Sequence, residues 1–139
     1  MNIHEYQAKQ LLGQYGVFVP QGEVCEKPEQ AKAVAEKIFA TGAKLVVIKS
    51  QIHAGGRGKG TFKSGFQGGV KLCQNAGDVF EKAKAMLGQV LVTKQTGPDG
   101  RLVSKVLVTA AYDIKKELYL AVLLDRGTCL LYTSPSPRD

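Results

Sequence analysis

The stretch LVVIKSQIHAGGRGKG, residues 45–60, decides how this 139-residue chain is interpreted. It opens with the apolar run Leu45 to Ile48, which predicts a strand covered on both faces. Lys49 lies directly at the end of that strand, and a glycine-rich loop, residues 54–69, follows it. Glycine lets backbone N–H groups approach a ligand closely, while Lys and Arg supply positive charge. The stretch therefore has the groups that a phosphate-binding site needs.

The loop matches neither of two common phosphate-binding motifs. It lacks the terminal Lys-Ser/Thr pair of a Walker A sequence, and no predicted helix follows its glycines as in a dinucleotide fingerprint. On these residues alone, phosphate binding and a mobile surface loop are equally open.

The positive charge of the chain is concentrated around this loop. The formal charge is +7, from 19 basic and 12 acidic residues, and no Asp or Glu occurs between residues 38 and 77. A solvated basic face and an anion site both fit this run. A basic nucleic-acid-binding module remains an alternative, although interleaved aromatic residues are sparse and no common binding motif is present.

Around the loop the chain predicts an α+β fold, with helices packed on a largely antiparallel or mixed sheet. The first helix, which ends near Gly16, has an apolar stripe that includes Leu11 and Leu12. The other predicted helices are residues 28–42 and 75–88, and the other predicted strands are 17–24, 70–73, 90–94, 102–110 and 118–124.

The composition is typical of one soluble globular domain, 44% hydrophobic and 22% charged. Neither a signal peptide nor an apolar run of membrane-spanning length is visible, so we expect a cytoplasmic protein with no membrane partner. The cysteines at 25, 73 and 129 have no spacing typical of disulfides or of a metal site.

The composition changes at the end of the chain. The run TCLLYTSPSPRD, residues 128–139, is rich in Ser and Pro and predicts no element that continues the preceding strand. We interpret residues 127–139 as a non-native tail, such as translated adapter or vector sequence. A native flexible terminus is the alternative.

Three segments carry a resemblance to a known family. QIHAGGRGK (51–59), HEYQAKQLL (4–12) and KELYLAVLLDR (116–126) closely resemble the beta subunit of succinyl-CoA synthetase, the succinate–CoA ligase of the citric acid cycle, in order and spacing. The resemblance covers residues 1–126 and implies the N-terminal part of an ATP-grasp fold. In that fold a nucleotide lies between two α+β subdomains, and a glycine-rich loop covers its phosphates.

The resemblance also implies roles for individual residues. Lys49 matches a lysine expected to contact the phosphates, and Gly56, Arg57 and Gly58 match the loop that closes on them. Arg57 is the candidate catalytic residue, because it would offset charge on the transferred phosphoryl group.

Two further residues match the purine side of the family's site. Glu117 matches an acidic residue of the purine and ribose region, and Tyr112 falls in the hinge along the purine. The alternatives are an exposed Glu117 paired with Lys115 or Lys116, and a buried core tyrosine.

Four positions refine the comparison. Thr109 departs from the family, where many members have glutamate, and Pro20 agrees with an ATP preference over GTP. His53 is next to the glycines, where we expect it to orient the loop; approach to the phosphoryl group is the alternative. The histidine phosphorylated in this family belongs to the alpha subunit, so neither His4 nor His53 is expected to have that role.

The full reaction that the resemblance implies is succinate + CoA + ATP to succinyl-CoA + ADP + phosphate, with an alpha subunit as partner. Magnesium ligands and the domain that meets the alpha subunit are expected beyond residue 126, so we expect this chain alone to have no ligase activity. A malate–CoA ligase beta subunit shares these motifs and is the nearest alternative, and a misfolded truncation that aggregates is another.

Overall fold

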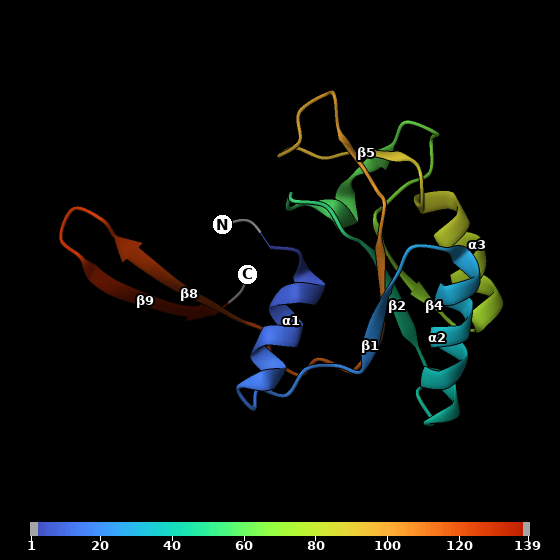
Figure 1. The fold of residues 1–139 in the computed structure, drawn as a ribbon, viewed down its shortest axis with the longest axis horizontal. Coiled ribbons are helices and arrows are strands. Elements are labelled where there is room, and N and C mark those ends of the chain that lie inside the picture. Colours follow the sequence, from blue (N-terminus) through green and yellow to red (C-terminus); the bar gives the residue numbers. More distant parts are fainter. Residues whose placement is uncertain (1–2, 138–139) are drawn as a thin grey trace.

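A computed structural model describes residues 3–137, which form a main sheet with helices on both of its sides (Figure 1). The strands of this sheet are antiparallel to their neighbours, in the spatial order β1-β7-β2-β4. Their bounds are β1 Gly22–Cys25, β7 Val106–Ala110, β2 Val46–Ser50 and β4 Val70–Cys73. The predicted α+β architecture is confirmed, and the predicted strand 17–24 is confined to the edge strand β1.

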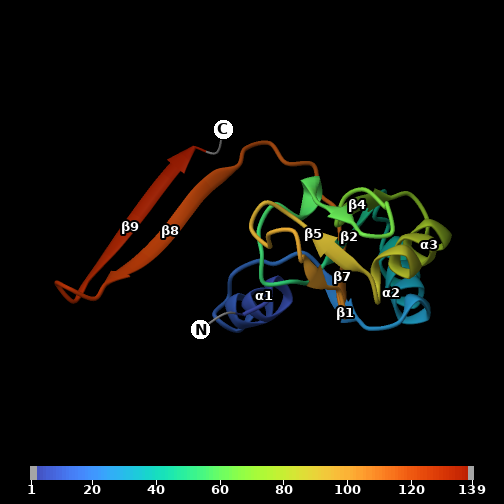
Figure 2. The ribbon, with the colours of Figure 1, turned by 90° about the horizontal axis from the view of Figure 1, so that it is seen from above.

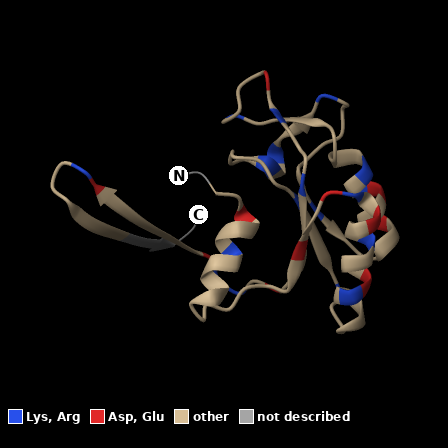
Figure 3. Cartoon of the chain, viewed as in Figure 1, with Lys and Arg blue, Asp and Glu red and all other residues tan. Residues whose placement is uncertain are grey.

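Two helices cover one face of the main sheet. Helix α2 (Pro28–Ala40) and helix α3 (Ala76–Met86) pack together on it, and α3 begins where the Asn75 side chain accepts a hydrogen bond of 2.8 Å from the Asp78 N–H. The side chains that these helices bury share small or aliphatic character: Ala31, Val34, Ala35, Ile38, Val79, Ala83 and Met86. Figure 3 shows acidic and basic residues mixed along the outer surface of both helices.

Strand β2 presents different side chains to the two faces. Val46 and Ile48 are buried towards α2 and α3, whereas Val47 and Lys49 are only half-buried on the opposite face. The predicted strand is present, and its cover is complete on one face and partial on the other. The alternation places Lys49 on the side of the sheet away from the core.

Helix α1 (Glu5–Gln14) lies on that opposite side, as both ribbon views show (Figures 1 and 2). It buries no side chain, and Leu11 and Leu12 are about half exposed. The predicted helix and its apolar stripe are present, and the stripe stays partly exposed. Polar contacts hold the N-terminal end of α1 instead, including a 3.2 Å hydrogen bond from the Tyr6 N–H to Gln51 Oε1.

A small second sheet stands at one end of the main sheet. It consists of β3 (Thr61–Phe62), β5 (Val90–Val92) and β6 (Arg101–Leu102). The predicted strand 102–110 is divided between β6 and β7, because the chain leaves one sheet for the other. At the break the Val103 N–H donates to Gln89 O, and Lys105 O accepts from the Gln51 N–H.

The remaining strands form a hairpin that projects from the body of the molecule (Figures 1 and 2). Strand β8 (Leu118–Asp125) pairs with β9 (Leu130–Pro137) in an antiparallel two-stranded sheet. The strand predicted at 118–124 is confirmed. The expectation that the end of the chain continues no regular structure is wrong for residues 130–137, which form β9. Residues 138–139 lie outside the described residues.

Within residues 3–137, no helix combines the length and the apolar character that crossing a bilayer requires.

Candidate functional site

The glycine-rich loop turns sharply beside the end of β2. Gly56 has φ of 72°, a left-handed conformation that glycine adopts without strain, and it begins the short helix η1 (Arg57–Lys59). The Gly69 N–H donates to Arg57 O over 2.7 Å and ties the turn to the other end of the loop. The N–H groups of Gly56, Arg57 and Gly58 donate to no acceptor within residues 3–137. They are available to an external acceptor.

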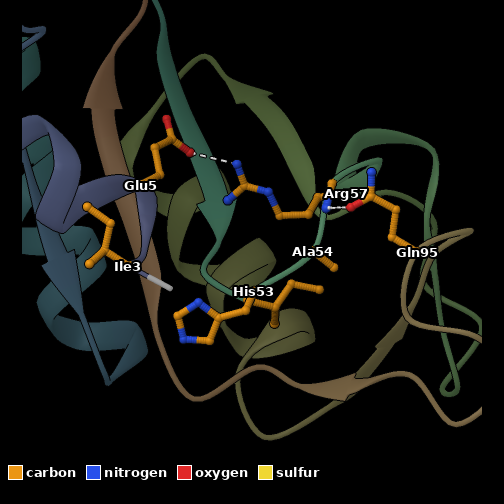
Figure 4. Close-up of a pocket in the computed structure, with 8 residues that line it drawn as sticks. Ile3, Glu5, His53, Ala54, Arg57 and Gln95 are labelled. Atoms are coloured by element: carbon orange, nitrogen blue, oxygen red, sulfur yellow. Dashed lines mark hydrogen bonds and ion pairs between the residues drawn. The ribbon is translucent and has the colours of Figure 1, made fainter. Parts of the chain in front are cut away.

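Two residues predicted to contact phosphate, Lys49 and Arg57, pair with the same carboxylate. Glu5 Oε1 lies 2.9 Å from Lys49 Nζ, and Glu5 Oε2 lies 2.8 Å from Arg57 Nη2 (Figure 4 draws the Arg57 pair). Lys9 Nζ lies 3.1 Å from Glu5 Oε1, and Arg57 Nη1 donates to Ser50 O over 2.6 Å. The structure thus brings Lys49 and Arg57 to the same place, with an acidic partner from α1.

The cations dominate the ionisation of Glu5. Burial would raise the pKa of its carboxyl, but hydrogen bonds from Lys49 and Arg57, with a further contribution from Lys9, lower the pKa to about 2. Glu5 is consequently an anion at every physiological pH.

An open pocket of about 470 Å³ lies next to this cluster, and Figure 4 shows Arg57, His53 and Gln95 around it. The Gln95 side chain accepts a hydrogen bond of 2.6 Å from the Gly55 N–H. The ring of His53 stacks on that of His4, with 3.8 Å between centroids. Burial and the neighbouring His53, Lys105 and Arg57 charges lower the pKa of His4. This stacked pair links the start of α1 to the loop.

A second pocket, of about 490 Å³, opens on the same side of the main sheet. It is mainly apolar, and Lys49 lines it together with Pro20, Thr109 and Tyr112. Lys49 therefore stands between an apolar pocket and the glycine-rich loop, an arrangement that suits a ligand with one planar apolar end and one anionic end.

Of the two residues predicted on the purine side, Tyr112 lines the apolar pocket and Glu117 does not. Tyr112 is 53% exposed and meets Phe18 edge to face at 6.0 Å, so it is not the buried core tyrosine of the alternative interpretation. Glu117 is exposed ahead of β8 and lines neither pocket. Among the residues that the structure describes, it forms no ion pair with Lys115 or Lys116.

Sequence reasoning missed Glu5 as a site residue. It belongs to the HEYQAKQLL segment, but it is 44 positions from Lys49 and 52 from Arg57. The available signal was the absence of acidic residues between 38 and 77, since clustered cations need a counter-anion from elsewhere in the chain.

No group of three or more His, Cys, Asp or Glu side chains among residues 3–137 could hold a metal ion.

Comparison with known proteins places these features in a family. The ATP-grasp domain profile matches residues 2–135. Relatives named succinate–CoA ligase [ADP-forming] subunit beta are 52% identical in Opitutus terrae and 56% in Syntrophobacter fumaroxidans, each over 92% of this chain. The mitochondrial relative from Dictyostelium discoideum is 47% identical over 97% of it.

The chain spans about a third of the length of these relatives, 30–32%. The resemblance drawn from the three sequence segments is confirmed by these matches. Because the profile covers nearly all of the sequence, the chain belongs to the ATP-grasp domain family.

Proposed function

We propose that this chain is the nucleotide-binding N-terminal part of an ADP-forming succinate–CoA ligase beta subunit. The observation that carries the proposal is the convergence of Lys49 and Arg57 beside the free N–H groups of the glycine-rich loop. Cations and oriented amides at one place are the groups that phosphates require. The names of the relatives support the ligase over its malate-specific counterpart.

The two pockets suggest how the nucleotide would be held. The phosphates would contact Lys49, Arg57 and the amides of residues 56–58, while the purine would enter the apolar pocket against Tyr112. Arg57 would offset negative charge that develops during phosphoryl transfer, where electrostatic stabilisation supplies much of the catalysis. The Glu117 contact that the family resemblance implies would require the segment before β8 to approach the pocket.

The apolar pocket also bears on the choice of nucleotide. Pro20 lines it and has no side-chain donor or acceptor, which supports ATP over GTP. Thr109 lines it where many family members have glutamate, and it is only 1% exposed, so this chain would lack one carboxylate contact to the purine.

The remaining parts of the proposal concern the whole protein. An alpha subunit would supply the histidine that is phosphorylated, and Mg²⁺ would accompany the nucleotide, held by residues outside this chain. We place the protein in the cytoplasm. We also propose that residues 127–139 are a non-native tail and that the 139-residue chain has no ligase activity by itself.

Calorimetric titration of ATP into this chain tests the proposal. Arg57→Ala should weaken binding by about 10- to 100-fold, because it removes a charge-assisted contact to phosphate. Lys63→Ala is the matched control, since Lys63 is an exposed cation of the same basic run and lines neither pocket. Equal ATP affinity in both variants and the unaltered chain would refute the assignment of Arg57.

The nucleic-acid alternative predicts a different result in the same samples. A nonspecific nucleic-acid binder would bind oligonucleotides with a steep salt dependence and would not respond to ATP.

A further inference from the structure

Glu5 occupies the centre of the cationic cluster. Each of its oxygens meets a different predicted phosphate ligand, Lys49 at 2.9 Å and Arg57 at 2.8 Å, and Lys9 adds a third cation at 3.1 Å. These are the distances of charge-assisted hydrogen bonds, or close to them. A carboxylate in this position makes the same kind of contacts that a phosphate oxygen would make.

The carboxylate and a phosphate compete for these cations. Two anions at hydrogen-bond distance from the same ammonium and guanidinium repel each other, and the repulsion is strong because Glu5 is only 21% exposed. A phosphate that binds Lys49 and Arg57 therefore weakens their hold on Glu5.

Helix α1, which carries Glu5, is built in a way that allows it to leave. No side chain of the helix is fully buried, so moving it uncovers only half-buried surface. Its ring stack and its backbone hydrogen bond to the rest of the chain lie at its start, namely the His4–His53 stack and the Tyr6 N–H to Gln51 hydrogen bond. Further along, Lys9 and Gln10 line a pocket between the helix and strands β1 and β7.

We propose that Glu5 is an internal counter-anion of the phosphate site, which holds Lys49 and Arg57 together in the unliganded chain and is displaced by the incoming phosphates. Nucleotide binding thereby loosens α1, and Glu5 lowers the affinity of the site for polyphosphates. The inference rests on the proposed function, because it assigns Lys49 and Arg57 to phosphate.

Titration with two ligands tests it. Inorganic tripolyphosphate and ATP are titrated separately, at constant ionic strength, into the unaltered chain, Glu5→Gln and Glu36→Gln. Glu36 is the matched control, since it pairs with Lys32 on α2, across the sheet from the site. We expect Glu5→Gln to bind tripolyphosphate about tenfold more tightly and Glu36→Gln to be unchanged. Equal or weaker tripolyphosphate binding by Glu5→Gln overturns the inference.

The two ligands separate this inference from the proposed function. If tripolyphosphate binding tightens in Glu5→Gln while no variant binds ATP, the counter-anion role stands and nucleotide binding fails. If ATP binds the unaltered chain and Glu5→Gln equally well, nucleotide binding stands and the counter-anion role fails.

A measurement on the unaltered chain keeps the test valid if Glu5→Gln does not fold. Amide hydrogen exchange is compared with and without saturating tripolyphosphate. Displacement of Glu5 predicts exchange about tenfold faster in α1 and unchanged exchange in β7, where every residue is buried. Unchanged or slower exchange in α1 with the ligand bound contradicts the displacement.

Discussion

The main sheet and the β8–β9 hairpin are built from similar residues but have opposite environments. Ile48 of β2 and Val108 of β7 are 0% exposed under α2 and α3, whereas Leu120 and Leu123 of β8 are 69% and 61% exposed. Both regions have the apolar pattern of strands. The difference shows that such a pattern predicts a strand, while a core also requires a second layer to cover it.

The hairpin has consequences for the behaviour of the chain. A two-stranded ribbon is marginally stable in water, and its exposed apolar side chains and free edges favour association. Thiol reactivity, side-chain truncation and acid response measure whether the two regions differ in packing as much as in exposure.

The largest expected difference is in thiol reactivity. Burial raises the pKa of Cys25 and Cys73 to about 11, whereas Cys129 is exposed in the hairpin turn. At pH 8 a thiol of pKa 11 is about one-thousandth ionised and a thiol of pKa about 8.5 about one-quarter ionised, so both core cysteines should be alkylated at least about a hundredfold more slowly than an accessible model thiol. Mass spectrometry after iodoacetamide treatment should find Cys129 labelled first. Labelling of all three at similar rates would show that the core opens freely.

Truncating a leucine in each region compares their packing directly. Leu91 of β5 is 0% exposed and Leu120 of β8 is 69% exposed. Leu91→Ala should lower the free energy of unfolding by about 2–5 kcal/mol through lost burial and a cavity, and Leu120→Ala by less than about 0.5 kcal/mol. Urea denaturation followed by circular dichroism measures both. Similar losses would mean that the hairpin is packed in solution.

Acid should lower the free energy of unfolding of the main sheet and its helices through Glu5. Its pKa is lowered from 4.5 to about 2 in the folded chain, so the unfolded chain binds the proton first as pH falls. The stabilisation is complete above about pH 4.5 and lost as pH falls towards 2; it amounts to at most about 3 kcal/mol. Denaturation between pH 2 and 6 should show a shallower pH dependence in Glu5→Gln.

Asp125 in the hairpin is the comparison for this effect. Hydrogen bonds from the Thr128 hydroxyl and the Gly127 N–H lower its pKa as well, but it lies in the hairpin and is only partly buried. Asp125→Asn should leave the acid transition of the body unchanged. A shift as large as that of Glu5→Gln would show that the hairpin and the body unfold as one unit.

The same contrast explains what the sequence could predict. Helices α2 and α3, strand β2 and the glycine-rich loop follow from local periodicity and from capping and glycine signals, as at Asn75. The Glu5 pairing could not be predicted, because it joins segments far apart in sequence. The partial exposure of α1 could not be predicted for a related reason, since an apolar stripe does not say whether another surface covers it.

At the end of the chain, pairing with a neighbouring strand overrides the local sequence signals. Residues 130–137 include Ser and Pro, which argue against a strand, yet they pair with β8 along its whole length. Their partner determines their conformation. Whether these residues are native to the protein stays a prediction.

The smallest effect expected is steric and concerns the edge of the main sheet. Gly22 of β1 faces β7 so closely that an added Cβ would lie 2.4 Å from Val108 O and 2.6 Å from Thr109 Cγ2. Gly22→Ala should therefore destabilise the body by about 1–3 kcal/mol through overpacking against backbone. Gly127 in the hairpin turn is the control, since a Cβ there meets only the Asp125 carboxylate at 3.3 Å.

Gly127→Ala should change the free energy of unfolding by less than about 0.5 kcal/mol in the same urea titration. A neutral Gly22→Ala would mean that β1 can move away from β7 without cost. Because Val24 and Thr109 both line a pocket shared with α1, the surface beneath that helix would then also be able to adjust.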